Sequence, residues 1–264
     1  MKIILSPAKK MNINDDMDVG VVTKPQFLEQ TEEILAWLKG QSHEDLQKLW
    51  ACNDKIAAQN FERLDHMELY RRLTPAILSY EGIAFQYMAP AVFEYGHFDY
   101  VQDHLRILSA FYGVLRPMDG VTPYRLEMSA TGTGFASQAK AVIGSHKNLY
   151  DFWGDRLYQA VRDDSGIIIN LASKEYSKCV EKYLGDRDRY ITITFCEESK
   201  GKLVTKGTYA KMARGEMVRY MAEKHIEDPE EIKGFDHLDY AFREDLSSDT
   251  EYVFERVVTL DFDR

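Results

Sequence analysis

Apolar positions early in the chain follow one strand-like run and then two helical patterns. Residues 2–5 form a short apolar run closed by a serine and a proline, which predicts a buried strand. Apolar residues then recur at helical spacing over 25–40, with a proline suited to the first turn of a helix. Ser42 and Asp45 form an S-x-x-D capping pattern, and the helical spacing after it predicts a second helix through Ile56.

The middle of the chain predicts one amphipathic helix and one strand. Between Phe98 and Leu108, apolar residues fall at steps of three, four and three, as on a helix with one buried face. This helix is expected to end at Tyr112-Gly113. Residues 124–128 alternate in polarity and predict a strand with Arg125 and Glu127 on one face.

Strands and helices interleave in the second half of the chain. The predicted segments are a strand at Ile167–Leu171, a helix from the cap Ser173 to Leu184, a strand at Tyr190–Cys196 paired with Lys202–Lys206, a helix from Thr208 to His225 and a strand at Tyr252–Val258. We find neither an internal repeat nor a long linker. The sequence therefore predicts one compact α+β (mixed α/β) domain over residues 1–264, with a mixed sheet flanked by helices.

Composition narrows the class of protein. The chain has 264 residues, 45% of them hydrophobic, which is enough for a large core. No apolar run approaches the roughly 20 residues of a membrane helix, and the first run is too short for a secretory signal. The three cysteines form no C-x-x-C pair, which suits a reducing compartment. We expect a cytoplasmic protein without a membrane partner, and the sequence indicates no obligate protein partner.

Charge is distributed unevenly along the chain. The net charge is −10, which by itself disfavours nucleic acid as a partner. However, residues 223–264 hold 14 acidic and 5 basic side chains, whereas residues 1–222 hold 29 acidic and 28 basic ones. A local basic cleft in the body of the protein is therefore compatible with the composition.

Three weaker motifs have ordinary structural explanations. Gly132-Thr133-Gly134 lacks the third glycine and the strand-to-helix setting of a dinucleotide loop. Glu198-Ser199-Lys200, which follows two aspartates at 186 and 188, has the outline of a metal-dependent nuclease, but a charged hairpin turn is favoured. His97, Asp99, Asp103 and His104 are the nearest approach to a metal cluster and resemble a solvated helix end. The sequence predicts no metal ion and no cofactor.

Three basic groupings could bind phosphate. The L-x-x-L-x-x-x-x-G-V pattern of residues 105–114 is typical of a helix entering a glycine hairpin, whose amides, with Arg116, could bind an anion; an ordinary helix end explains it equally well. Lys211 and Arg214 share a helix face that could contact phosphate or simply face solvent. Lys9 follows the first strand, where an α/β sheet presents residues to a crevice, although a surface loop would also account for it.

Six longer segments carry a family resemblance. They are L-S-P-A-K at Leu5–Lys9, R-I-L-S-A-F-Y-G-V-L-R-P-M-D at Arg106–Asp119, P-Y-R-L-E-M at Pro123–Met128, L-Y-D-F-W-G-D at Leu149–Asp155, I-N-L-A-S-K-E-Y at Ile169–Tyr176 and K-M-A-R-G-E-M-V-R at Lys211–Arg219. In this order they resemble the YaaA family of bacterial peroxide-stress proteins, essentially from end to end. The chain departs from the family pattern at Lys10, Ala110 and Ser177.

The resemblance implies a cytoplasmic protein of the hydrogen peroxide response that limits oxidative damage by keeping reactive iron and its attack on DNA in check. It also implies DNA binding through a basic cleft and a helix-hairpin-helix element. Our leading hypothesis is that the protein grips the DNA backbone with little sequence preference. The expected contacts are Arg106, Tyr112, Gly113, Val114, Arg116, Lys211 and Arg214, with Arg125, Lys9 and Asn170 as weaker candidates.

A rival hypothesis is an enzyme of unknown reaction. Motifs that combine an aromatic residue, a carboxylate and a base can supply acid and base groups or a buried ion-pair network. The polar pocket would be formed by Ser6, Lys9, Arg125, Glu127, Asp155 and Asn170, with Lys211. A third hypothesis, direct iron binding, depends only on the four residues around His97 and has little support.

Overall fold

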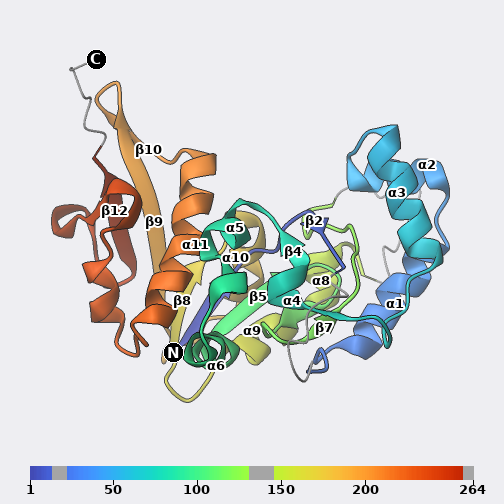
Figure 1. Cartoon of the computed structure of the whole chain (residues 1–264), viewed down its shortest axis with the longest axis horizontal. Helices are drawn as coiled ribbons and strands as arrows, with labels where there is room; N and C mark the ends of the chain where they lie inside the picture. The colour runs from blue at the N-terminus through green and yellow to red at the C-terminus, as the bar shows by residue number, and fades with distance from the viewer. Residues whose placement is uncertain (14–22, 131–145, 258–264) are drawn as a thin grey trace.

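A mixed eight-stranded sheet forms the centre of the computed structural model, which describes residues 1–13, 23–130 and 146–257 (Figure 1). Strands β1, β5, β8, β9 and β12 run parallel, so their carboxyl ends share one edge. The order is β11 (Tyr240–Phe242), β12 (Glu251–Arg256), β9 (Arg189–Ser199), β8 (Ile167–Leu171), β1 (Lys2–Leu5), β5 (Leu105–Ser109) and β6 (Gly113–Leu115), with β10 (Lys202–Val204) paired to β9.

Helices cover both faces of this sheet. On one face α11 (Gly207–Glu223) packs against α5 (Ile83–Met88) and α6 (Tyr95–His104). The other face carries α8 (Leu149–Trp153), α9 (Arg156–Val161) and α10 (Lys174–Glu181). The helices therefore shield both faces of the sheet from solvent. Accordingly, β1 is a continuous apolar strand whose Ile3, Ile4 and Leu5 are buried. No helix in the described parts of the chain is both long and apolar enough to cross a membrane.

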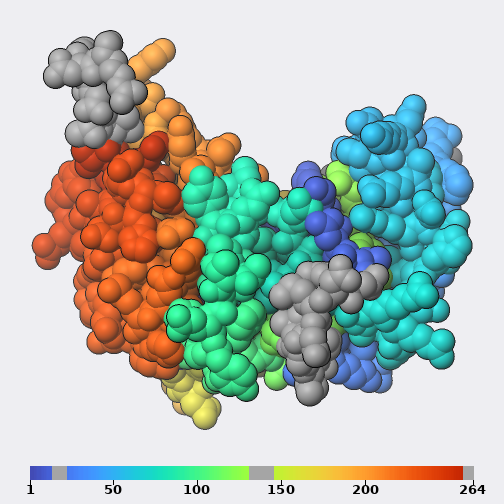
Figure 2. Space-filling view, viewed as in Figure 1, coloured from blue at the N-terminus to red at the C-terminus, as the bar shows by residue number. Residues whose placement is uncertain are grey.

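A helical arm projects from one side of the sheet. It consists of α1 (Leu28–Lys39), α2 (His43–Trp50) and α3 (Asp54–Asp65). Two short ladders lie at its base, β2 (Lys10–Met11) with β4 (Tyr80–Glu81) and β3 (Thr74–Pro75) with β7 (Gly120–Val121), next to α4 (Ala76–Ser79). Figure 2 shows the molecule hollowed between this arm and α11, and we call this concavity the hollow.

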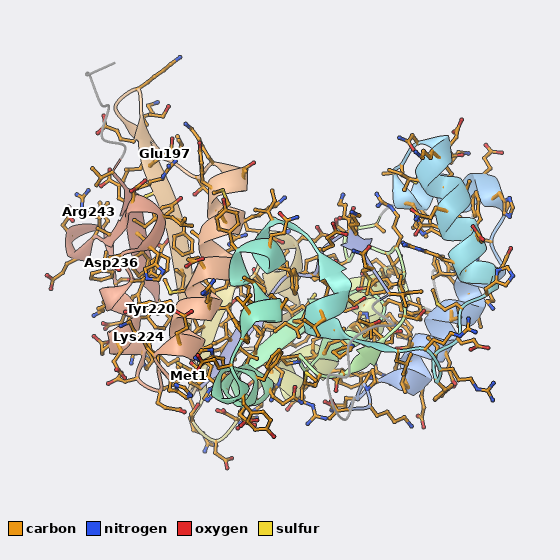
Figure 3. The ribbon with its side chains drawn as sticks, in the orientation of Figure 1. Met1, Glu197, Tyr220, Lys224, Asp236 and Arg243 are labelled. Carbon is orange, nitrogen blue, oxygen red and sulfur yellow. The ribbon has the colours of Figure 1, made fainter. Side chains whose placement is uncertain are left out.

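The acidic C-terminal part lies at the opposite end of the sheet from the arm. Its short helices η2 (Pro229–Gly234), η3 (His237–Asp239) and η4 (Glu244–Leu246) pack around β11 and β12, and η1 (Pro90–Val92) belongs to the α5–α6 connection. We call residues 226–257 the outer lobe. Asp236 and Arg243 lie on it in Figure 3, far from α1–α3.

Most predicted elements are confirmed. The strands β1, β8, β9 and β12, the β9–β10 hairpin and the helices α1, α10 and α11 all lie within two or three residues of their predicted positions. Ser42 caps α2 as predicted, since its Oγ accepts a hydrogen bond from the Asp45 amide at 3.2 Å. The expected single run through Ile56 is divided, because Ala51 takes a positive φ of 44° and α3 begins at Asp54.

Two predictions in the middle of the chain are wrong. The helix expected over 98–108 ends at His104, because Leu105–Ser109 forms a strand beside β1. The apolar spacing of this segment is compatible with a helix and with a strand. Pairing with the central strand β1 favours the strand. Consequently Gly113 lies in a β-hairpin between β5 and β6, and the helix-hairpin-helix element placed there is absent. No strand forms over Tyr124–Met128. A two-helix unit joined by a short turn does occur at α2–α3.

Candidate site at the ends of the parallel strands

Two serines join the carboxyl ends of the neighbouring strands β1 and β8. The Ser6 Oγ accepts a hydrogen bond from the Ser173 amide at 2.8 Å, and the two hydroxyl oxygens lie 3.1 Å apart. Asn170 also acts here, since its Oδ1 accepts from the Ala172 amide at 2.9 Å. Ligands of α/β proteins usually bind outside such strand ends. Of the sequence candidates, Ser6 and Asn170 lie at the ends of neighbouring strands, and their hydrogen bonds reach the adjacent residues Ser173 and Ala172.

A cavity of about 580 Å³ opens beside these strand ends. Helix α10 contributes one side, β9 the floor, and α11 a single arginine. The lining is rich in hydroxyl groups and holds both signs of charge. Its residues are Asn170, Ala172, Ser173, Lys174, Ser177, Glu181, Thr192, Ile193, Thr194, Phe195, Thr205, Arg214, Thr250 and Glu251. We call this the strand-end cavity.

Arg214 is the unusual member of the strand-end cavity. Its Nε is buried and has no hydrogen-bond partner, and within the described residues the guanidinium forms no ion pair. Burial lowers the pKa of this guanidinium, but arginine stays charged in proteins. Arg219, on the same helix, is bonded to Glu223 at 2.7 Å. Arg214 and Lys174 are therefore two cations of this lining without an ion pair among the described residues, and Glu181 and Glu251 are the carboxylates of the same lining.

The other enzyme candidates do not enter the strand-end cavity. Lys9 forms an exposed ion pair with Glu127, with 2.7 Å between Nζ and Oε2. Arg125 donates from Nε and Nη2 to the Trp50 carbonyl at 3.3 and 3.2 Å, which satisfies the C-terminal end of α2. Asp155 is exposed and accepts only from Gln159, at 3.4 Å, among the described residues. The predicted pocket of six residues is therefore dispersed.

Three of the predicted DNA contacts lie inside the protein. Tyr112 is fully buried, Val114 is 4% exposed, and Gly113 packs against Trp153 and Phe27. The Tyr112 hydroxyl accepts a hydrogen bond from the Thr122 amide at 3.1 Å, so its polar group also faces inward. These positions have no surface to offer to a phosphate, because they form the packed hairpin β5–β6.

The basic candidates fall into two separate groups. Arg106 donates to the carbonyls of Gln102 and Leu105 at 3.1 and 2.8 Å, and Arg116 lies 3.5 Å from Asp119. Lys211 and Arg214 belong to α11, which packs on β9. Two strands, β8 and β1, separate β9 from β5, a span of roughly 14 Å at about 4.8 Å per step. The two groups cannot act as one contact point.

The proposed metal and nuclease motifs have other roles. His104 lies 2.9 Å from the Met1 carbonyl through Nδ1, and His97 accepts from the Glu94 amide in a helix cap. Lys200 occupies the β9–β10 turn at a φ of 54°, as expected of a charged hairpin. No group of three metal-ligating side chains occurs over 1–13, 23–130 and 146–257. Gly132-Thr133-Gly134 lies outside the described residues.

Sequence reasoning missed a buried hydroxyl network at the end of β5. The Tyr124 hydroxyl lies 2.8 Å from that of Tyr80 and 2.7 Å from the Ser109 Oγ. Ser109 also accepts from the amides of Phe111 and Tyr112. Burial raises the pKa of Tyr124 to about 12, so this network is neutral. The P-Y-R motif was the available signal, but only the fold reveals its partners.

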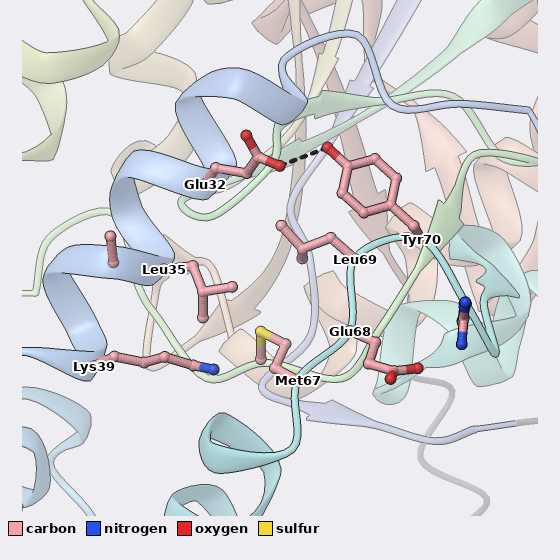
Figure 4. Close-up of a pocket in the computed structure, with 9 residues that line it drawn as sticks. Glu32, Leu35, Lys39, Met67, Glu68, Leu69 and Tyr70 are labelled. Carbon is pink, nitrogen blue, oxygen red and sulfur yellow. Dashed lines mark hydrogen bonds between the residues drawn. The ribbon is translucent and has the colours of Figure 1, made fainter.

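A second cavity lies on the arm. It has a volume of about 470 Å³ between α1 and the segment 67–71 (Figure 4). Its wall is largely apolar, and the Tyr70 hydroxyl closes one end by donating to Glu32 at 2.6 Å. None of the candidates from the sequence lies in this cavity, so it does not change the choice of site.

Comparison with known proteins adds a family to this geometry. A family model described as peroxide stress protein YaaA matches residues 1–246. A UPF0246 protein of Agathobacter rectalis is 65% identical over 258 residues, which cover 98% of this chain and all of the relative. A UPF0246 protein of Lachnoclostridium phytofermentans is 51% identical over 254 residues, 96% of each chain. One of Limosilactobacillus reuteri is 47% identical over 258 residues, 97% of this chain and all of its own.

Proposed function

Because the chain belongs to the family of the peroxide stress protein YaaA, we propose that it serves the peroxide response by binding the DNA backbone in the hollow. Two observations support the proposal: the molecule is hollowed beside α11, and Lys211 is an exposed cation of that helix. Lys211 is exposed and has no acidic partner in the part of the chain that the structure describes. An unpaired cation beside a concavity suits a phosphate backbone.

The distribution of acidic residues supports this choice of surface. The segment from Glu223 onward carries 14 acidic and 5 basic residues, and its described part forms the outer lobe. That lobe lies beyond β9, whereas the arm lies at the other end of the sheet. Repulsion of DNA by these carboxylates falls off over roughly 10 Å at moderate salt. The hollow is therefore the better surface for a polyanion.

The proposed contact set differs from the one expected from sequence. Lys211 stays in it, because it is exposed and forms no ion pair among the described residues. Tyr112, Gly113 and Val114 leave it because they are buried. Arg116 leaves it because it pairs with Asp119, and Arg106 and Arg214 leave it because they are half-buried.

Two of the described thiols favour protection by binding over direct reaction with peroxide. Burial raises the pKa of Cys179 to about 12 and also raises that of Cys196. Peroxide attacks thiolates, and these groups are thiols at neutral pH. We propose that the protein limits iron-dependent damage by covering the DNA backbone.

The test is binding of purified protein to a short duplex, followed by fluorescence anisotropy at two salt concentrations. We expect wild-type affinity to fall with salt, and Lys211→Glu to weaken binding at least fivefold while lowering the salt slope by about 1. Lys224→Glu is the matched control, since Lys224 is exposed at the far end of α11, on the outer-lobe side in Figure 3. Equal loss in both variants, or no binding at low salt, would refute the proposed surface.

A second assay addresses the damage itself. Plasmid DNA is exposed to Fe²⁺ and hydrogen peroxide with wild-type protein, Lys211→Glu or no protein, and nicks are counted. We expect wild-type protein to reduce nicking and Lys211→Glu to lose most of this effect. Equal protection by both proteins would show that the effect does not depend on DNA binding through the hollow.

A further inference from the structure

The strand-end cavity is lined by residues of several elements, many of them polar, and is unused by the proposed DNA contact. We infer that it binds a small phosphate ester carrying hydroxyl groups, with the phosphate held by Arg214 and Lys174. The inference goes beyond the proposed function, because the ligand is a small molecule and its residues are not those of the DNA surface.

Arg214 carries the argument for an anion. A guanidinium presents five N–H donors, and in Arg214 the buried Nε–H meets no acceptor among the described residues. Arg214 is half-buried, and leaving the buried part of a charged group unpaired is unfavourable, so a partner at this position would stabilise it. The protein chain provides that partner for Arg219 in Glu223 but provides none for Arg214. An anion bound in the cavity would supply it.

The surroundings of Arg214 favour phosphate over carboxylate. Lys174 lines the same cavity and is the first residue of α10, and the Ser173 hydroxyl beside it makes no cap to that helix. The amides of Lys174 and Glu175 donate to no acceptor in the described structure. Thr205 adds a hydroxyl group to the lining. A phosphate monoester suits two cations and helix amides better than a carboxylate does, because it has three terminal oxygens and carries up to two negative charges.

The rest of the lining suits hydroxyl groups. Glu181 and Glu251 face the same cavity and are acceptors that already take one bond each, from Tyr190 at 3.2 Å and from Thr194 at 2.6 Å. Asn170 and Thr192, 3.4 Å apart, can both donate and accept. Carboxylates would repel a second phosphate but would accept hydrogen bonds from sugar hydroxyls. A monophosphate with a hydroxylated body therefore matches the hydrogen-bond donors and acceptors of the lining.

The test measures binding of ribose 5-phosphate by isothermal titration calorimetry, with ribose and inorganic phosphate as reference ligands. We expect ribose 5-phosphate to bind wild-type protein at least tenfold more tightly than either reference. Arg214→Met should lose at least tenfold in affinity, whereas Arg219→Met should bind as wild type does. Arg214→Lys keeps the charge but not the planar set of N–H donors, so its affinity should lie between those of wild type and Arg214→Met. This variant also provides the test if Arg214→Met does not fold.

Several outcomes would overturn the inference. Absence of ribose 5-phosphate binding at millimolar concentration would do so, as would equal binding by the Arg214 variants. Equal affinity for ribose would refute the role of the phosphate, and equal affinity for inorganic phosphate would refute the role of the hydroxyl groups. Duplex binding by Arg214→Met should match wild type, so failure of the DNA proposal and failure of this one are separable.

Discussion

Ser6 and Ser173 are 167 positions apart, yet the Ser173 amide donates to the Ser6 hydroxyl oxygen at 2.8 Å. This bond fixes the turn after β1 to the start of α10, directly beside the strand-end cavity. A single polar contact thus links the centre of the sheet to the candidate ligand site.

Removal of this contact should lower the stability of the protein. Ser6→Ala leaves the Ser173 amide without its acceptor, so we expect a loss of about 1–2 kcal/mol in the free energy of unfolding. Ser129→Ala is the control, because Ser129 is exposed and uses only its backbone amide, which donates to Glu175. Chemical denaturation measures both variants. Equal stability of Ser6→Ala and wild type would show that the bond contributes nothing net.

Gly113 and Gly201 form a matched pair that separates backbone strain from crowding. Their φ angles are 76° and 75°, so alanine is strained equally at both. A Cβ at Gly113 would lie 2.8 Å from the Trp153 ring and 2.9 Å from Phe27, whereas nothing lies within 4 Å at Gly201. We expect Gly201→Ala to cost about 1 kcal/mol and Gly113→Ala about 3 kcal/mol or more. Similar losses in urea denaturation would contradict the packing described for the β5–β6 hairpin.

Gly215 marks the closest approach of two helices. A Cβ there would come within 1.8 Å of the Ala84 carbonyl oxygen, so α11 and α5 pack backbone to backbone. We expect Gly215→Ala to cost about 3 kcal/mol or more, because the obstacle is main chain and cannot rotate away. Gly207→Ala, in the first turn of α11 with open space around it, should change stability by less than about 1 kcal/mol. Thermal unfolding of both variants provides the comparison.

Asp163 gives the protein an acid-sensitive contact. Burial alone would raise its pKa, but hydrogen bonds from Ser165 and the Met1 ammonium group, with Lys2 nearby, lower the pKa of Asp163 to about 2. An unfolded aspartate titrates near 3.9. The stabilisation is therefore complete above about pH 4 and is lost as the pH falls to about 2.

The variant Asp163→Asn tests this pH dependence. At pH 7 it should melt below wild type, and the difference in melting temperature should shrink steadily between pH 4 and pH 2. Asp164→Asn, next in the chain and exposed, should match wild type throughout. A difference that stayed constant down to pH 2 would mean that ionisation of Asp163 is not its source.

Local sequence signals were sufficient where local chemistry decides the structure. The Ser42 cap and the β-branched run of β9 were readable because capping and strand propensity act over a few residues. Leu105–Ser109 was read as helix because its spacing suits both states and its partner β1 lies about one hundred residues earlier. The same error led to the prediction that Gly113 is exposed, whereas it packs inside the β5–β6 hairpin.

The candidate site was harder to predict than the fold. Ser6 and Asn170 were chosen as polar members of the family motifs, and the structure has them at the carboxyl ends of the neighbouring strands β1 and β8. Lys9, which was expected at such a strand end, pairs with Glu127 instead. Arg214 was assigned to a surface because helical spacing gives a face but not what that face meets. Its lack of a partner depends on α10, β9 and the start of β12, which no pattern within α11 encodes.

The central position of β1 also bears on how the chain folds during synthesis. Residues 2–5 leave the ribosome well before their neighbours in the sheet, which are Leu105–Ser109 and Ile167–Leu171. Until the second of these has emerged, Ile3 and Ile4 have no sheet to enter and stay available to chaperones. Strand β12, one of the two parallel neighbours of β9, is completed only at Arg256. Folding should therefore be late and cooperative, and nascent chains halted before residue 171 should be sensitive to protease along most of their length.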